Sequence, residues 1–122
     1  MSAPVGEHDP VPPVITPGRF AGRSDLITGA VQGIGRAVAD RVVREGGAVT
    51  VVDRSGLISS VAEELTGLSP DRIGVTPVEA DLETFEGAHA AADAALAAHG
   101  QIDTLINNVG GTIWARPYEE YS

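Results

Sequence analysis

Residues 28–35 read TGAVQGIG, and this short run dictates the architecture of the chain around it. It follows the segment Asp25–Thr28 and opens a segment in which Ile34, Val38 and Val42 recur at the spacing of one helix face. Glycine reaches positive φ without a Cβ clash, so the glycines at 29, 33 and 35 suit a tight turn between a strand and a helix. Their missing side chains also let backbone N–H groups approach an anion at the positive end of the helix dipole.

Apolar periodicity extends this pattern along the chain. Strands are expected at 25–28, 48–52, 73–78 and 102–107, and helices at 33–45, 57–68 and 85–99. The alternating order indicates an α/β fold, in which a parallel sheet is covered on both faces through right-handed crossovers. A doubly wound sheet of the Rossmann type places its first four strands in the order 3-2-1-4, and this one would be truncated after about four strands. Pro77 removes a ladder donor from the third strand, which therefore belongs at a sheet edge.

A second signature, NNVG at residues 107–110, follows the fourth strand. In the order 3-2-1-4 the connections reverse direction between strands one and four, and ligands bind outside the carboxyl ends of strands at such a switch point. The glycine turn and the NNVG segment follow those two strands. We therefore expect them to line one crevice, in which the helix N-terminus binds the pyrophosphate of a dinucleotide.

Asp53 ends the second strand, 18 residues beyond Gly35. A carboxylate at this position accepts hydrogen bonds from the adenosine ribose and repels a 2′-phosphate, which favours NAD over NADP. Gln32 offers no positive charge to a phosphate. Arg54 is the contrary signal, because an arginine beside the ribose accommodates NADP. The alternative is that Asp53 caps the next helix and that Arg54 is solvated.

Together with Asp81-Leu82, these motifs resemble the pattern of the short-chain dehydrogenase/reductase family over the chain from about residue 19. The resemblance implies NAD as the cofactor and the following cofactor-binding residues: Gly29, Gly33, Ile34, Gly35, Asp53, Arg54, Asp81, Leu82, Asn108 and Gly110. It implies that Asp81 contacts the adenine amino group, with the Leu82 backbone beside it, and that Asn108 and Gly110 lie along the adenosine ribose. The alternatives are a helix N-terminal acid for Asp81 and a strand-end hydrogen bond for Asn107, and both are compatible with binding.

The run from Asn107 to Pro117 is more specific, and it resembles the benzoate cis-diol dehydrogenases, which oxidise 1,6-dihydroxycyclohexa-2,4-diene-1-carboxylate. The resemblance implies NAD-dependent removal of a hydride from the ring carbon that bears the secondary hydroxyl. The resulting β-keto acid loses carbon dioxide and becomes a catechol. The implied small-molecule substrate is thus a cyclic diol carboxylate, with Arg116 as a candidate partner of its carboxylate and Trp114 as a candidate wall. The alternative is that Trp114 packs against other helices and that Arg116 is solvated.

The catalytic residues of this family are a serine and a Tyr-x-x-x-Lys pair, in which the lysine lowers the tyrosine pKa. This chain contains no lysine, so neither Tyr118 nor Tyr121 is assigned the catalytic role. We expect an N-terminal half of such an enzyme, with no catalytic residue and no turnover of its own. The alternatives are a non-catalytic nucleotide-binding fragment and a family member acting on a different alcohol or ketone. His8, His89 and His99 lack the spacing of a metal site, so no metal is expected.

Composition sets the remaining expectations. The chain has 122 residues, no cysteine and a net charge of −9, which exclude disulfides and thiolate–metal sites and disfavour a nucleic acid partner. Proline-rich residues 1–18 are expected to be a disordered extension, followed by a partial NAD-binding domain at 19–122. No run approaches about 18 consecutive apolar residues, so we expect no membrane span and a cytoplasmic location. The family resemblance implies that full-length members are homo-oligomers. An exposed fourth strand predicts marginal stability for the isolated chain.

Overall fold

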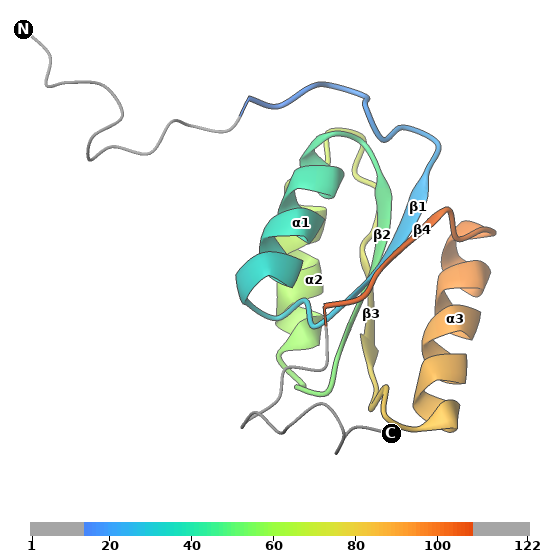
Figure 1. Cartoon of the computed structure of the whole chain (residues 1–122). Helices are drawn as coiled ribbons and strands as arrows, with labels where there is room; N and C mark the ends of the chain where they lie inside the picture. Colours follow the sequence, from blue (N-terminus) through green and yellow to red (C-terminus); the bar gives the residue numbers. More distant parts are fainter. Residues whose placement is uncertain (1–13, 109–122) are drawn as a thin grey trace, which may run out of the picture.

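The fold is a four-stranded parallel sheet with helices on both faces, seen in a computed structural model that describes residues 14–108 (Figure 1). The strands are β1 (Ser24–Thr28), β2 (Ala48–Asp53), β3 (Thr76–Glu79) and β4 (Thr104–Ile106), and the helices are α1 (Gly33–Arg44), α2 (Ile58–Thr66) and α3 (Phe85–His99). The strand order is β3-β2-β1-β4. Helices α1 and α2 cover one face and α3 covers the other, so the predicted order 3-2-1-4 and the covering of both faces are confirmed.

The core has two layers, because successive strand residues point to opposite faces of the sheet. Ile27 packs with Val51 and Leu65 in the layer under α1 and α2, and all three are fully buried. Leu26 packs with Ala91 in the smaller layer under α3. Strand β1 lies between β2 and β4 and is buried along its whole length, which places the end of β1 at the centre of the carboxyl edge.

The third strand begins later than its periodicity predicts. The apolar pattern starts at residue 73, but β3 begins at Thr76, because the backbone N–H of Val75 donates to Thr66 Oγ1 at the end of α2 (3.0 Å). Pro77 lies in β3, which pairs only with β2 in the part of the chain that the structure describes. The edge position expected from this proline is confirmed.

The fourth strand is shorter than predicted. It spans Thr104–Ile106 rather than 102–107, because the Asp103 carboxylate accepts the backbone N–H of Ser24 (2.8 Å) in place of a main-chain carbonyl. Among residues 14–108, β4 pairs only with β1, and Leu105 on β4 is 60% exposed. The exposed apolar strand expected from the sequence is therefore present in the described residues.

The helix face predicted for α1 is wrong at its first position. Ile34 is 73% exposed, whereas Ala39, Val42 and Val43 form the buried face. Ile34 lies in the first turn of α1, at the carboxyl edge of the sheet.

Residues 14–20 lie across the C-terminal end of α1 before the chain enters β1 (Figure 1). Thr16 and Arg19 in this segment both donate hydrogen bonds to Glu45, which caps that end of α1. The domain start at residue 19 stays a prediction, although residues 14–18 also contact the helix. Within the described residues, no helix combines the length and the apolar character needed to cross a bilayer.

Candidate functional site

The turn between β1 and α1 has the backbone geometry that its glycines predict. Gly29 and Gly33 have φ values of 62° and 68°, in the left-handed region where a Cβ would be strained. A Cβ on Gly33 would meet nothing within 4 Å, whereas a Cβ on Gly35 would lie 2.5 Å from the carbonyl oxygen of Gly29. Gly33 therefore leaves open space beside the turn, and Gly35 lets the helix pack closely against it.

Helix α1 begins at this turn without a capping side chain. Its N-cap residue, Gln32, makes no side-chain hydrogen bond to the first turn, and that turn contains no acidic residue. The first N–H groups of a helix have no partner within the helix, and the dipole places positive charge there. A pyrophosphate fits this arrangement, because it supplies the acceptors that the protein does not.

The end of β1 is joined to the end of β4 through one hydroxyl group. Thr28 Oγ1 donates to Asn107 Oδ1 (3.2 Å) and accepts the backbone N–H of Asn108 (2.9 Å). Asn108 Nδ2 donates in turn to the Gly29 carbonyl oxygen (3.3 Å). The glycine turn and the asparagine pair therefore meet at one edge, and Asn107 makes the strand-end hydrogen bond that was one of its two expected roles.

Asp53 at the end of β2 is bonded to the same turn. Its Oδ2 accepts the backbone N–H of Val31 (3.4 Å), and its Oδ1 accepts the backbone N–H of Ser55 (2.9 Å). The N-cap of α2 is Leu57, and no side-chain bond caps that helix, so the alternative role of Asp53 as a helix cap is wrong. Arg54 is exposed and forms no ion pair with any residue in 14–108.

Asp81 and Leu82 lie after β3, close to the end of β2. Ala80 donates its backbone N–H to the Asp53 carbonyl oxygen (3.0 Å), which brings this loop beside Asp53. Asp81 is exposed, and its Oδ1 accepts the backbone N–H of Glu83 (2.9 Å). Thr84, rather than Asp81, caps α3 by accepting the N–H of Gly87 (3.0 Å). Asp81 therefore precedes the N-terminus of α3 without capping the helix, and its side chain is exposed at the carboxyl edge.

The structure thus brings most of the predicted cofactor-binding residues to one edge of the sheet. They come from the ends of all four strands: Gly29, Gly33, Ile34, Gly35, Asp53, Arg54, Asp81, Leu82 and Asn108. Other predicted residues lie outside the described part of the chain: Gly110, Trp114, Arg116, Tyr118 and Tyr121. Among residues 14–108, no cluster of His, Asp and Glu could hold a metal ion.

Two polar residues of β1 were missed from the sequence. Thr28 connects the strand ends, and the signal was a hydroxyl residue directly before the first glycine. Asp25 is 3% exposed, and burial raises the pKa of its carboxyl group above the usual range, against the opposing effect of Arg23. Asp25 lies near the start of β1, away from the glycine turn, so it is not part of the candidate site.

Comparison with known proteins agrees with this geometry. The profile of the short chain dehydrogenase family matches residues 25–122. The 1,6-dihydroxycyclohexa-2,4-diene-1-carboxylate dehydrogenase of Pseudomonas putida is 52% identical over 103 residues, covering 84% of this chain and 37% of that protein. The protein of the same name from Acinetobacter baylyi is 48% identical over 104 residues, covering 85% of this chain and 39% of that protein. The chain thus spans well under half the length of these curated relatives.

The fold is also shared with solved structures. Carveol dehydrogenase from Mycobacterium avium, in complex with NAD, matches with a TM-score of 0.70 at 26% identity, over 86% of this chain and 42% of that one. The family profile covers the glycine turn, Asp53 and the asparagine pair, and the observed strand order agrees with it. On this combined ground, the chain belongs to the short-chain dehydrogenase family.

Proposed function

We propose that this chain binds NAD for an oxidoreductase that converts a cyclic cis-dihydrodiol carboxylate into a catechol with loss of carbon dioxide. The observation that carries the cofactor part is the position of Asp53, whose carboxylate is hydrogen-bonded to the glycine turn through the N–H of Val31. The same turn leads to Gly33, which has open space beside it, and to the uncapped start of α1. The Asp53 carboxylate would accept hydrogen bonds from the ribose hydroxyls of a dinucleotide bound at this turn. The pyrophosphate would accept hydrogen bonds from the first N–H groups of α1.

The remaining residues of the edge fit the adenosine half of the cofactor. Asp81 would accept a hydrogen bond from the adenine amino group, with the Leu82 backbone beside it. Asn108 would lie along the adenosine ribose, held in place by its bonds to Thr28 and Gly29. Gly110 would also lie along the adenosine ribose. When bound, the nicotinamide ring supplies the acceptor for the hydride.

The preference for NAD over NADP rests on charge. A 2′-phosphate would lie next to the Asp53 carboxylate, and like charges repel. Because Val31 and Ser55 hold this carboxylate, it cannot turn away without breaking two hydrogen bonds. The exposed Arg54 beside it favours a second candidate, a family member that uses NADP and acts on a different alcohol or ketone.

The substrate part of the proposal is supported by the two relatives named for the diol carboxylate, at 52% and 48% identity. Asn107 to Pro117, the run on which the resemblance depends, lies partly outside the described residues. Arg116 would pair with the ring carboxylate and Trp114 would pack against the ring. No residue of this chain is assigned the proton transfer.

Calorimetric titration of the chain with NAD and with NADP tests the cofactor part. We expect NAD to bind more tightly than NADP. We expect Asp53→Asn to weaken NAD binding about ten-fold and to make the affinities for NAD and NADP more nearly equal. Asp40→Asn, a carboxylate change on the exposed side of α1, is the matched control and is expected to bind like the wild type. Tighter binding of NADP would favour the second candidate, and binding of neither nucleotide would refute the cofactor role.

The substrate part is tested on the longest product of the gene. The gene is read beyond codon 122, and the longest product is incubated with NAD and the cis-diol carboxylate. Formation of NADH together with catechol supports the proposal. NADH formation from other alcohols alone would assign a different substrate, and nucleotide binding without any turnover would favour the non-catalytic alternative.

A further inference from the structure

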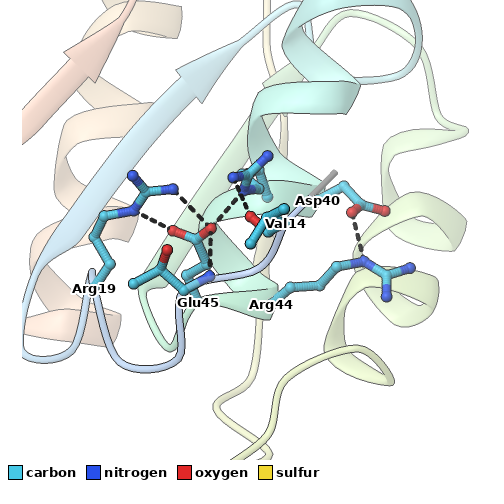
Figure 2. A network of polar contacts seen from close by, with 7 residues as sticks. Val14, Arg19, Asp40, Arg44 and Glu45 are labelled. Carbon is cyan, nitrogen blue, oxygen red and sulfur yellow. Dashed lines mark hydrogen bonds and ion pairs between the residues drawn. The ribbon is translucent and has the colours of Figure 1, made fainter. Parts of the chain in front are cut away.

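A buried carboxylate lies at the edge of the sheet opposite the glycine turn. Glu45 follows α1, and its side chain is fully buried at 0% exposure. A charge in the protein interior is tolerated only when it is paired and hydrogen-bonded. Figure 2 shows that its partners come from residues 14–20, before β1, and from α1 itself.

Three groups converge on the Glu45 carboxylate. Arg19 donates from Nε to Oε1 (2.5 Å) and from Nη2 to Oε2 (2.8 Å), the two-pronged geometry of strong arginine–carboxylate pairs. The backbone N–H of Thr16 donates to Oε2 (3.2 Å), and Arg41 donates from Nε to the same oxygen. Arg41 also donates to the Val14 carbonyl oxygen (2.5 Å). Glu45 therefore binds the segment at Thr16 and Arg19, and Arg41 binds it at Val14.

Apolar contact contributes mainly at the Phe20 end of the segment. Phe20 packs against the core under α1, and its backbone N–H donates to the Glu45 carbonyl oxygen (3.1 Å). A Cβ on Gly47 would lie 3.0 Å from Phe20 Cβ, so Phe20 lies close to the chain at Gly47. In contrast, Val14 is 75% exposed, and residues 16–19 are exposed as well. Ile15 is half-buried and lines a cavity along α1, and the other contacts of residues 14–19 with the helix end are polar.

The charge of Glu45 is retained at neutral pH. Among the described residues, the ionisable groups in contact with it are Arg19 and Arg41. Hydrogen bonds, above all from Arg19 and then from Arg41 and Thr16, lower the pKa of Glu45 to about 2, although burial acts in the opposite direction. A glutamine at this position would keep one acceptor oxygen but would leave both guanidinium groups without a charged partner.

We propose that residues 14–20 form a clasp that Glu45 locks onto the end of α1, and that the clasp opens as a unit while the sheet stays folded. The clasp precedes β1, and none of its residues takes part in the strand pairing. Opening exposes the Arg19–Phe20 peptide bond and the part of the core against which Phe20 packs. Local openings of this kind are where proteases enter a folded domain.

The clasp crosses the end of the sheet where the strands begin, and the glycine turn lies where they end (Figure 1). Ile15 of the clasp also lines a cavity along α1 that reaches Gly33 of the turn. This inference does not depend on which cofactor or substrate the protein uses.

Hydrogen exchange and trypsin cleavage of the full chain test the clasp. In Glu45→Gln we expect the Thr16 amide to exchange at least about ten-fold faster, because a charge-assisted bond network is lost, and cleavage after Arg19 to accelerate by a similar factor. Amides of β2, such as Val51, are expected to keep their wild-type protection. Asp40→Asn, which removes only the exposed pair with Arg44 on the same helix, is the matched control and is expected to change neither readout.

A second variant keeps the test decisive if the glutamine variant does not fold. Arg19→Met keeps the unbranched stem of a side chain that is 47% exposed, and it removes the bonds to Glu45 together with the contact of the guanidinium group with the Phe20 ring. Faster exchange at Thr16 with unchanged protection of β2 supports the clasp. Equal acceleration at Thr16 and Val51 would show that the segment opens only with the whole sheet, and unchanged exchange at Thr16 would show that Glu45 does not lock it; either result overturns the inference.

Discussion

Substituting Gly35 by alanine tests the close approach between the glycine turn, α1 and the asparagine pair. The added Cβ would lie 2.5 Å from Gly29 O, 2.8 Å from Asn108 Nδ2 and 3.0 Å from Thr28 O. Two of these three atoms belong to the main chain of the turn, which cannot rotate away as a flexible side chain would. The strand end, the turn or the helix must therefore shift by several tenths of an ångström.

The magnitude follows from three contributions. Overpacking costs about 1–3 kcal/mol, and loss of the hydrogen bond between Asn108 and Gly29 costs about 1 kcal/mol. Replacing a glycine inside a helix by alanine gains about 1 kcal/mol, which offsets part of this cost. We therefore expect Gly35→Ala to lower the free energy of unfolding by about 1–3 kcal/mol.

Urea unfolding followed by far-ultraviolet circular dichroism measures this change. The control is Gly74→Ala, because a Cβ at Gly74 would meet no atom within 4 Å and its φ is not in the left-handed region. The control is expected to unfold within about 0.5 kcal/mol of the wild type. If Gly35→Ala were as stable as this control, the close approach at the turn would be wrong.

Three further predictions follow. Gly33→Ala places alanine at a φ of 68° in open space, so we expect the free energy of unfolding to fall by about 1–2 kcal/mol in urea unfolding. We expect the free energy of nucleotide binding, measured by calorimetry, to fall by more than this. An NAD affinity equal to that of the wild type would argue against the turn as the pyrophosphate site. Thr28→Val removes the hydroxyl that joins β1 to Asn107 and Asn108, so we expect about 1–2 kcal/mol less stability and faster exchange of the Asn108 amide; wild-type exchange there would contradict the bond. The pKa of Glu45 is lowered from 4.5 to about 2, so its contribution is complete above pH 4.5 and disappears as the pH falls through about 2. The difference in urea midpoint between wild type and Glu45→Gln should therefore shrink as the pH falls from 4.5 to about 2. The raised pKa of Asp25 acts in the opposite direction, but it cancels in this difference because both proteins carry Asp25. A difference that stays constant would contradict the ionised state of Glu45.

Most of the fold and much of the candidate site could be predicted because their signals are local. The glycines at 29 and 33 require positive φ, and such a requirement is written in the residue type itself. The alternation of strands and helices indicates a parallel sheet with right-handed crossovers, and the parallel direction of the strands brings Asp53 and Asn108 to the same edge. The direct bonds from Asp53 to Val31 and from Asn108 to Gly29 agree with that expectation.

Features that depend on particular partners far along the chain could not be predicted. Ile34 has the spacing of a core residue, yet it lies in the first turn of α1, past the end of the covered sheet. The starts of β3 and β4 depend on hydrogen bonds from Val75 to Thr66 and from Ser24 to Asp103. Periodicity reports which face of an element is apolar, but it carries no information about which side chain will take a given backbone donor.

Glu45 is the clearest example of a feature that only the folded structure reveals. In the sequence it is one acidic residue before two glycines, with nothing to distinguish it from the solvated acids of a chain with a net charge of −9. In the folded chain it is fully buried and accepts hydrogen bonds from Thr16 and Arg19, which are 29 and 26 positions away. Repeating patterns and glycine conformations are set by neighbouring residues and can be recognised in the sequence. Burial and pairing of a charge exist only after distant segments have packed together, because only then is water replaced by other groups of the protein.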